Sequence, residues 1–303
     1  MILVIGATGT IGTALVRCLA NYEEPVRALV RPRRQRSSYP NQHGVQPQQS
    51  RIESSQIHYM EGEVMDLATL QHAMRGVEKI FLSMGNGPMQ REIELSVVRE
   101  AAKANIEHFV KVSAPIVGPH VPIDIGRLHF EIEESIIATG MSHTFLRPYG
   151  FMQNLLQQAH VIGTTGTFFG STGHAKMNLV DARDVAEVGA LALANCQTMQ
   201  GTFVLTGPQT ISYPEIAHQM SQTLGYRVTY INQTPQRFRS GLEANKLPAW
   251  LIEHLMQIQK SVVEQEELPN SIFEQLMGSS PRTLDAFLKE HKSAFLHREP
   301  RYI

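Results

Sequence analysis

The chain has 303 residues, of which 42% are hydrophobic and 18% are charged, and its formal net charge is −1. This balance gives no electrostatic reason to expect direct binding of nucleic acid. No apolar run approaches the ~20 residues that cross a bilayer, and the two cysteines are too few for a disulfide framework. We therefore expect a cytoplasmic protein built as one large α/β domain or as a core with an added lobe.

The first eighteen residues predict a strand, a glycine turn and a helix. Residues 2–5 are Ile-Leu-Val-Ile, which is typical of a buried strand, and apolar residues return at helical spacing from Ile11. Between them lie Gly6, Gly9 and Gly12. We expect Gly6 to adopt a turn conformation closed to other residues, Gly9 to let the backbone approach a phosphate, and Gly12 to let the helix pack closely. The pattern indicates a dinucleotide-binding turn, with a purely structural turn as the alternative.

The second predicted strand, residues 25–30, is followed by a group of arginines. In a Rossmann unit the end of this strand lies beside the adenosine ribose, where an acid would bind the 2′-hydroxyl. Arg31, Arg33 and Arg34 stand here instead, and guanidinium groups pair well with a 2′-phosphate. The sequence therefore favours NADP(H) over NAD(H). A solvated basic loop is the alternative for Arg34 and Arg36.

The rest of the first half predicts a parallel sheet. After a polar surface insertion at 35–56, we expect strands at 57–60, 79–84 and 108–113, alternating with helices at 67–74, where Asp66 is the N-cap, and 91–105. Ser83, Met84 and Gly85 follow the apolar part of the fourth strand, at the edge where ligands bind such sheets. The predicted fold class is α/β, a doubly wound parallel Rossmann sheet with a smaller, mostly helical C-terminal lobe.

The second half is predicted to complete the sheet and then become mostly helical. We expect a helix at 125–139, a strand at 144–148, a short hairpin at 164–170, a helix at 185–194 with Asp184 as its N-cap, and strands at 202–206 and 228–231; further helices are expected at 213–224, 236–243, 249–263, 271–276 and 283–295. Residues 1–150 would form the NADP-binding core, with 176–207 returning to the sheet. Residues 151–175 and 208–303 would form a lobe on the substrate side.

Several motifs along the chain together resemble the NmrA-like branch of the atypical short-chain dehydrogenase/reductases. They are Gly6-Ala-Thr-Gly-Thr-Ile-Gly12, Arg31, Phe109-Val-Lys-Val-Ser113, His129-Phe-Glu-Ile-Glu133, Leu146-Arg-Pro-Tyr-Gly-Phe-Met-Gln-Asn154 and Asp181-Ala-Arg-Asp-Val-Ala186. The resemblance extends over nearly the whole chain. It implies a Rossmann fold and a bound dinucleotide. That branch contains NADPH-dependent quinone and dye reductases, and also proteins that bind the dinucleotide to sense redox state and regulate a partner.

The predicted active-site helix departs from the usual short-chain reductase pattern, Tyr-x-x-x-Lys. Aligning Glu133 with the glutamate of the extended members places His129 at the lysine and Ile125 at the tyrosine, so the phenolic proton donor is missing. His129 matches the histidine of the quinone reductases, and we expect it to hydrogen-bond the nicotinamide ribose or a substrate oxygen. The alternative is a surface histidine paired with Glu133. Ser113 stands near the usual serine, but without the tyrosine it has nothing to orient.

The candidate site therefore combines two catalytic candidates, His129 and Ser113, with a larger cofactor set. The resemblance implies that Pro148, Tyr149 and Phe151 wall the nicotinamide. The expected cofactor-binding residues are Gly6, Thr8, Gly9, Thr10, Ile11, Gly12, Arg31, Arg33, Ser83, Met84, Gly85, Ser113, His129, Pro148, Tyr149 and Phe151. No metal-ligand spacing is present, and no metal is expected.

Two functions are consistent with these residues. The first is an NADPH-dependent reductase that transfers a hydride to a quinone or similar planar acceptor. A quinone needs little help beyond positioning, so the missing tyrosine does not exclude this chemistry. The second is a non-catalytic NADP(H)-binding redox sensor that acts through a protein partner. In the first case the partner is a small-molecule acceptor, and in neither case do we expect nucleic acid or membrane binding.

Overall fold

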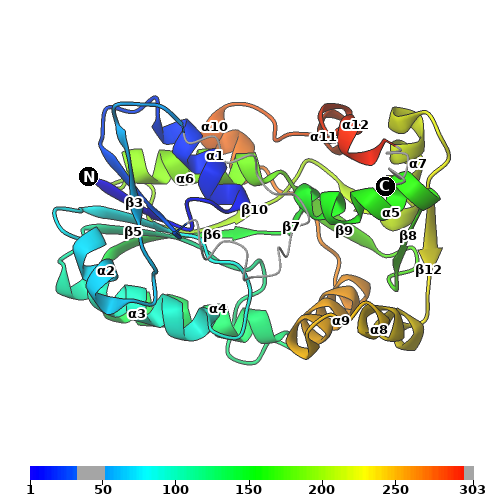
Figure 1. The fold of residues 1–303 in the computed structure, drawn as a ribbon, viewed down its shortest axis with the longest axis horizontal. Helices are drawn as coiled ribbons and strands as arrows, with labels where there is room; N and C mark the ends of the chain where they lie inside the picture. Colours follow the sequence, from blue (N-terminus) through cyan, green and yellow to red (C-terminus); the bar gives the residue numbers. More distant parts are fainter. Residues whose placement is uncertain (33–51, 297–303) are drawn as a thin grey trace. The chain divides into compact units, whose positions relative to one another are not determined.

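The computed structural model describes residues 1–32 and 52–296, which form two compact units (Figure 1). The first unit contains the described residues up to Pro148 together with Ala182–Leu205. The second contains Tyr149–Asp181 and the described residues from Thr206 onward. Within these described ranges, none of the helices has both the length and the apolarity that crossing a bilayer requires.

The first unit is built on a seven-stranded sheet in which all neighbouring strands are parallel. In spatial order the strands are β3 (Ile57–Glu61), β2 (Val26–Val30), β1 (Ile2–Ile5), β4 (Lys79–Leu82), β5 (His108–Val112), β6 (Ser142–Pro148) and β10 (Gly201–Leu205). The order reverses beside β1, as in the doubly wound dinucleotide-binding folds. The predicted fold class is confirmed.

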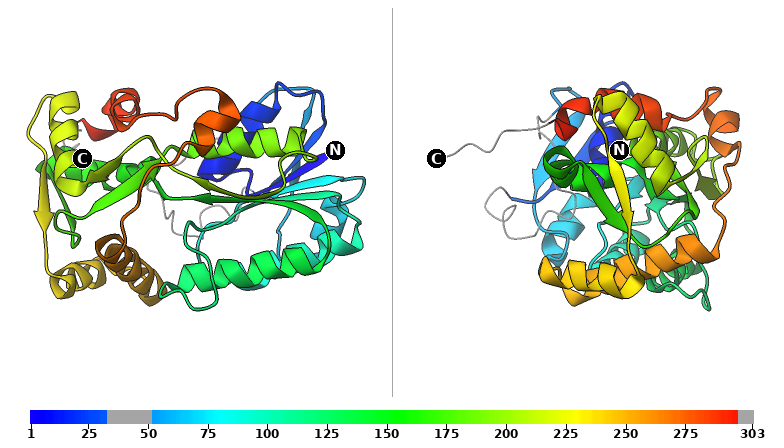
Figure 2. Two further views of the ribbon diagram at one scale, coloured as in Figure 1. Left: turned by 180° about the vertical axis from the view of Figure 1, so that it is seen from behind. Right: turned by 90° about the vertical axis from the view of Figure 1, so that its right-hand side faces the viewer.

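Helices cover both faces of this sheet (Figures 1 and 2). The helices α1 (Thr10–Leu19) and α6 (Ala182–Ala194) pack together on one face, and α2 (Leu67–Ala73), α3 (Gln90–Lys103) and α4 (Asp124–Ala138) cover the other. Leu3 and Ile5 of β1 are buried in the core beneath α2–α4, because alternate side chains of a strand point to opposite faces. Asp66 caps α2 as predicted, accepting hydrogen bonds from the backbone N–H groups of Ala68 and Thr69.

The second unit combines short strands with most of the C-terminal helices. A three-stranded sheet has the order β11-β9-β7, and β12 pairs with β8. The strands are β7 (Gly150–Phe151), β8 (Thr167–Gly170), β9 (Lys176–Val180), β11 (Thr210–Ser212) and β12 (Thr229–Asn232); the helices are a 3-10 helix (Met152–Gln158), α5 (Ala159–Thr165), α7 (Tyr213–Leu224), α8 (Pro235–Ala244), α9 (Ala249–Glu264), α10 (Ile272–Met277), α11 (Leu284–Glu290) and α12 (Lys292–Phe295). Phe168, Phe287 and Phe295 lie in its own hydrophobic core. Ser212 caps α7 through a capping box with Glu215.

Some predicted elements differ in the structure. The hairpin expected at 164–170 is wrong: α5 extends to Thr165, and β8 pairs in parallel with the distant strand β12. Asp184 is not an N-cap but lies buried within the first turn of α6, which begins at Ala182. Of the segment 176–207, α6 and β10 belong to the first unit, whereas β9 pairs with β7 and β11 in the second. For β8 and β9 a long-range pairing decides the structure, and local sequence patterns do not report such pairings.

Candidate functional site

The glycine turn between β1 and α1 leaves no room for side chains at two of its positions. Gly6 has a φ of +87°, and a Cβ built on it would lie 1.8 Å from the carbonyl oxygen of Ser83. A Cβ on Gly12 would lie 2.1 Å from the carbonyl oxygen of Gly6. Gly9 is less constrained, with a 3.2 Å approach to Gly6 O, and its exposed backbone is the N-cap of α1. The expected turn conformation of Gly6 and the close packing at Gly12 are therefore present in the fold.

The start of α1 has the features of an anion-binding site. Within the described residues no side chain caps this helix, and no acidic residue lies in its first turn. Thr10 is exposed and Thr8 is half-buried, whereas Ile11 is buried beneath the turn. Unpaired N–H groups and the positive end of the helix dipole favour a bound phosphate here. The residues present thus fit the pyrophosphate of a dinucleotide.

The predicted residues of the first unit come together at the carboxyl edge of its sheet. Ser83 follows β4, and its N–H donates to the carbonyl of Ile5 at 3.1 Å, which places it directly beside the glycine turn. The exposed Arg31 follows β2, the neighbour of β1 on the other side. Ser113 follows β5, and its N–H donates to the carbonyl of Leu146 on β6 at 2.7 Å. Met84 and Gly85 continue from Ser83, and Pro148 ends β6 at the same edge.

Ser113 lies in a cluster with the carboxylate of Glu133 and the guanidinium of Arg147. Its hydroxyl donates to Oε1 of Glu133 on α4 at 2.6 Å. The Arg147 guanidinium on β6 binds the same carboxylate, with Nε donating to Oε1 at 3.1 Å and Nη2 to Oε2. Because an ionised carboxylate only accepts hydrogen bonds, the serine proton is directed to Glu133. Glu133 therefore orients the Ser113 hydroxyl.

His129 lies inside the protein and not on the helix surface. Its side chain is on α4 and the residue is only 5% exposed, so the alternative of a surface histidine is wrong. The Glu133 partners are Ser113 and Arg147, and Nδ1 of His129 is buried without a hydrogen-bond partner in the structure described. Burial, followed by the positive charges of Lys111 and Arg147, holds the pKa of His129 well below its usual range. The imidazole is therefore neutral at physiological pH.

A second buried ion pair lies close to this histidine. Lys111 on β5 and Glu94 on α3 are both fully buried and pair with each other. Lys111 also donates to the carbonyl of Val112 at 3.0 Å, and Gln90 donates to Glu94 Oε1 at 2.9 Å. The sequence interpretation missed this pair, although one signal was available. The signal is the lysine inside the apolar run of β5, because a buried lysine requires a buried partner. That partner is Glu94, which lies one helical turn after Gln90 on α3.

Three predicted site residues lie outside the first unit or the described ranges. Arg33 lies outside the described residues. Tyr149 and Phe151 belong to the second unit, where Phe151 is in β7 and Tyr149 precedes that strand. Burial, and then the negative charge of Glu267, raises the pKa of Tyr149. The sequence interpretation also missed Glu267, since no motif surrounds it.

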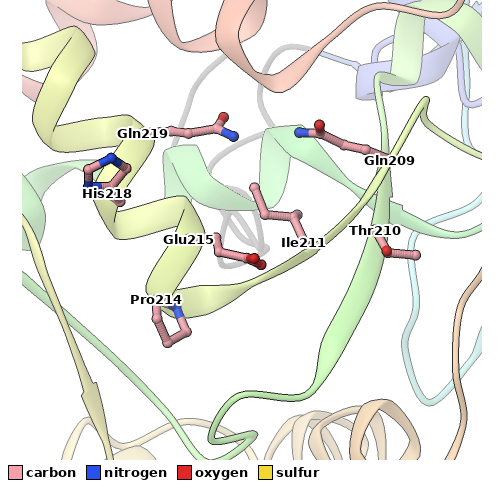
Figure 3. A pocket seen from close by; sticks show the side chains of 7 residues that line it. All are labelled: Gln209, Thr210, Ile211, Pro214, Glu215, His218 and Gln219. Atoms are coloured by element: carbon pink, nitrogen blue, oxygen red, sulfur yellow. The ribbon is translucent and has the colours of Figure 1, made fainter.

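The second unit has a surface pocket of about 360 Å³ beside β11 and α7 (Figure 3). It is lined by Gln209, Thr210, Ile211, Pro214, Glu215, His218 and Gln219. None of the predicted site residues that the structure describes is among them. Across residues 1–32 and 52–296, no three His, Cys, Asp or Glu side chains gather as metal ligands would.

Comparisons with known proteins agree with the resemblance seen in the motifs. The model of the NmrA-like family matches residues 1–290. The chain is 31% identical over 297 residues to the NAD(P)H azoreductase of Xenophilus azovorans. The aligned region covers 97% of this chain and 99% of that protein. Two solved structures share the fold, each covering 96% of this chain and 99% of its own. They are the Citrobacter sp. triphenylmethane reductase complexed with NADP(H) (TM-score 0.79, 21% identity) and an Escherichia coli NADPH-dependent quinone oxidoreductase complexed with NADPH (TM-score 0.77, 22% identity). The chain belongs to the NmrA-like family.

Proposed function

We propose that this protein is an NADPH-dependent reductase that transfers a hydride to a planar, conjugated acceptor, an azo compound or a quinone. The observation that carries the proposal is the glycine turn at the start of α1, in a chain that is 31% identical over nearly its full length to an azoreductase. The neighbouring fold relatives are named for reduction of a quinone and of a triphenylmethane dye. These acceptors share an extended conjugated system that is ready to accept two electrons.

The chain's residues divide the binding of the cofactor between them. The N–H groups at the start of α1 would hold the pyrophosphate, with Gly9 allowing its close approach. Arg31 would pair with the 2′-phosphate of the adenosine ribose, which gives the preference for NADP(H). His129, neutral and buried, would hydrogen-bond the nicotinamide ribose, and Pro148 would wall the ring. When bound, the reduced dinucleotide supplies the hydride.

Ser113 and His129 would position the reactants and would not donate protons. The Ser113 proton is directed to Glu133, so this hydroxyl offers lone pairs to a ligand. A neutral imidazole is a poor proton donor near pH 7, since its second proton is lost only at high pH. Ile125 occupies the place of the usual tyrosine and has no proton to give. Correct placement of the hydride donor beside the acceptor would then supply much of the rate.

Turnover with a panel of acceptors tests the proposal. The purified protein is mixed with NADPH and an azo dye, a quinone or a triphenylmethane dye, and the loss of NADPH absorbance is followed by stopped flow. We expect turnover with at least one of them, and slower turnover with NADH. Tight binding of NADPH without oxidation by any acceptor would contradict the proposal and favour the redox-sensor function, in which a protein partner distinguishes NADP⁺ from NADPH.

A further inference from the structure

A chain of hydrogen-bonded side chains runs from β5 across β6 towards β10, within the first unit. Ser142 and Thr144 lie two residues apart on β6, so their side chains point to the same face of the sheet. The imidazole of His108, the first residue of β5, bridges them: its Nδ1 lies 2.9 Å from Ser142 Oγ, and its Nε2 lies 2.9 Å from Thr144 Oγ1. The Thr144 hydroxyl donates in turn to the carbonyl of Met199, shortly before β10.

The direction of each hydrogen bond follows from the single proton that each hydroxyl carries. Thr144 uses its proton on the Met199 carbonyl, so its oxygen accepts from His108, and the ring proton lies on Nε2. A neutral imidazole has one ring proton, so Nδ1 is an acceptor and the Ser142 hydroxyl donates to it. A hydroxyl held against a base that a third group orients is the arrangement of an activated nucleophile.

The surroundings of His108 keep its ring neutral at physiological pH. His108 and Thr144 are fully buried. Burial, followed by the positive charges of His143 on β6 and Lys79 on β4, lowers the pKa of His108 to about 4. The ring is therefore free to accept the hydroxyl proton near neutral pH. Because burial disfavours the charged ring, the proton would move only as the serine oxygen forms its new bond.

Ser142 brings the end of this chain to the surface of the first unit. It lines a hollow of about 560 Å³, in which Ile137 and Met141 provide apolar surface. A Cβ built on Gly140 or Gly201, which also line the hollow, would meet nothing within 4 Å, so the space above them is open. The hollow lies where β6 and β10 begin, whereas the glycine turn follows the carboxyl end of the parallel strand β1. It is therefore at the opposite edge of the sheet from the expected cofactor.

We propose that Ser142 is a nucleophilic acyl-acceptor site, with His108 as its general base and Thr144 as the residue that positions the base. The substrate class is a small carboxylic ester with a good leaving group. The Ser142 oxygen attacks the carbonyl carbon as its proton passes to Nδ1 of His108. The bond from that carbon to the leaving oxygen then breaks, the leaving group takes the proton, and the acyl group stays on Ser142 as an ester. No electrons are transferred, so this activity is independent of the proposed reductase function and needs no NADPH.

Acetylation by p-nitrophenyl acetate tests this site. The full chain is mixed with the ester without NADPH, the release of p-nitrophenol is followed by stopped flow, and the acetylated residue is identified by mass spectrometry of peptides. The wild type should show a burst of about one equivalent and an acetyl group on Ser142. Ser142→Ala should lose both. The exposed Ser240 on α8 is the internal comparison and should stay unmodified.

Variants of the other two side chains test their roles. His108→Gln removes the base and should slow the acetylation of Ser142 by roughly 100-fold or more. His58→Gln, the same change at an exposed position of β3, is the matched control and should react as the wild type does. Thr144→Val removes the hydroxyl that orients the ring and should slow the reaction, whereas Thr144→Ser should restore it. Thermal unfolding shows which variants are folded, and the two Thr144 variants carry the test if His108→Gln does not fold.

Two further measurements distinguish a base-assisted serine from an ordinary one. The rate of Ser142 acetylation should stay level from about pH 6 to about pH 8, because His108 is neutral throughout this range. A serine that reacts only as its alkoxide would react about tenfold faster with each pH unit. NMR of the ring nitrogens should show His108 as the tautomer with its proton on Nε2.

Each outcome of these experiments supports or overturns the proposal. A wild type without an acetyl group on Ser142 overturns the site itself. An unchanged rate in folded His108→Gln or Thr144→Val, a tenfold rise per pH unit, or a ring proton on Nδ1 overturns the role of His108 as the base. The proposed reductase function stands in all these cases, since its assay uses NADPH and a different acceptor.

Discussion

The hydroxyl of Ser113, the residue directly after β5, donates a hydrogen bond to Glu133 on α4 at 2.6 Å, inside the protein. This contact links the strand edge to the helix, and Arg147 on β6 closes the cluster through the same carboxylate. The cluster fixes the Ser113 hydroxyl and directs its proton to Glu133.

Removing members of this cluster should destabilise the protein unequally. Ser113→Ala deletes one hydrogen bond to a charged group and should lower the free energy of unfolding by about 1–2 kcal/mol. Glu133→Ala leaves the half-buried Arg147 guanidinium unpaired, and the loss should reach about 3 kcal/mol. Urea denaturation of both variants measures the difference, with Glu134→Ala on the exposed face of α4 as control. Equal losses for Ser113→Ala and Glu133→Ala would contradict the cluster as described.

Substitutions in the glycine turn should separate effects on folding from effects on NADPH binding. Gly6→Ala places a Cβ against the carbonyl of Ser83 at a positive φ, so we expect a loss of several kcal/mol of stability. Gly9→Ala has more room and should fold, yet NADPH binding should weaken by roughly 10-fold or more because the methyl group blocks the phosphate. Gly87→Ala, where nothing lies within 4 Å, is the control. Thermal unfolding and NADPH titration measure the two effects. Tight NADPH binding by Gly9→Ala would argue for a purely structural turn.

The fold could be predicted from the sequence because its signals are local. The apolar run at 2–5, the glycine spacing and the cap at Asp66 each depend on neighbours within a few residues, and all are found in the structure. The Rossmann order follows from alternating strands and helices. The hairpin at 164–170 failed for the opposite reason, since β8 pairs with β12, some sixty residues away.

The chemistry of the site was less accessible from the sequence. His129 and Glu133 stand one turn apart on α4, which suggested a mutual pair. Only the structure shows that Glu133 binds partners from β5 and β6 while His129 is buried beside two cations. The spacing of two residues along a helix shows that they lie on the same face. It does not show which other residues pack against that face. Glu267 illustrates the same limit, because its burial depends on contacts with β9.

The preference for NADPH should depend on Arg31. Replacing this exposed residue with aspartate puts a carboxylate beside the expected 2′-phosphate, so the Kd for NADPH should rise by about 10- to 100-fold. The Kd for NADH should change little, since that cofactor has no phosphate there. Fluorescence titration with both nucleotides measures this, and Arg75→Asp, on an exposed residue after α2, is the control. Equal weakening of both nucleotides would remove the reason for naming the phosphate.

His108 should make the first unit sensitive to acid. Its ring nitrogens lie 2.9 Å from Ser142 Oγ and Thr144 Oγ1, and burial, followed by the charges of His143 and Lys79, lowers its pKa to about 4. The unfolded chain binds a proton near pH 6.5 but the folded chain does not. Stability is therefore fully present above about pH 6.5 and falls as the pH drops toward 4, by at most about 1.4 kcal/mol per pH unit.

The pH dependence of urea denaturation tests this role of His108. His108→Gln should flatten the slope between about pH 6.5 and about pH 4. His58→Gln, on an exposed position of β3, should leave it unchanged. An unchanged slope in the His108 variant would mean that other groups cause the acid sensitivity.

The buried ion pair of Lys111 and Glu94 should show strong coupling in the free energy of unfolding. Lys111→Met leaves the Glu94 carboxylate without its cation, and Glu94→Gln leaves the lysine without its anion, so each change should cost about 3–5 kcal/mol. The double variant contains neither charge and should lose much less than the sum of the two. A double-mutant cycle by urea denaturation measures this coupling, which should exceed about 2 kcal/mol. The exposed pair of Lys289 and Asp285 on α11, at 2.7 Å, is the control and should couple by less than about 0.5 kcal/mol.

The same double variant also tests the environment of His129. Removing Lys111 removes one of the two cations that lower the pKa of this histidine, while burial and Arg147 remain. The pKa of His129 should therefore rise and still stay below its usual value, which NMR titration of the ring can follow. A histidine pKa that did not move would show that burial and Arg147 keep His129 neutral without a contribution from Lys111. The buried ion pair would then serve to join α3 to β5, with no influence on the chemistry of the site.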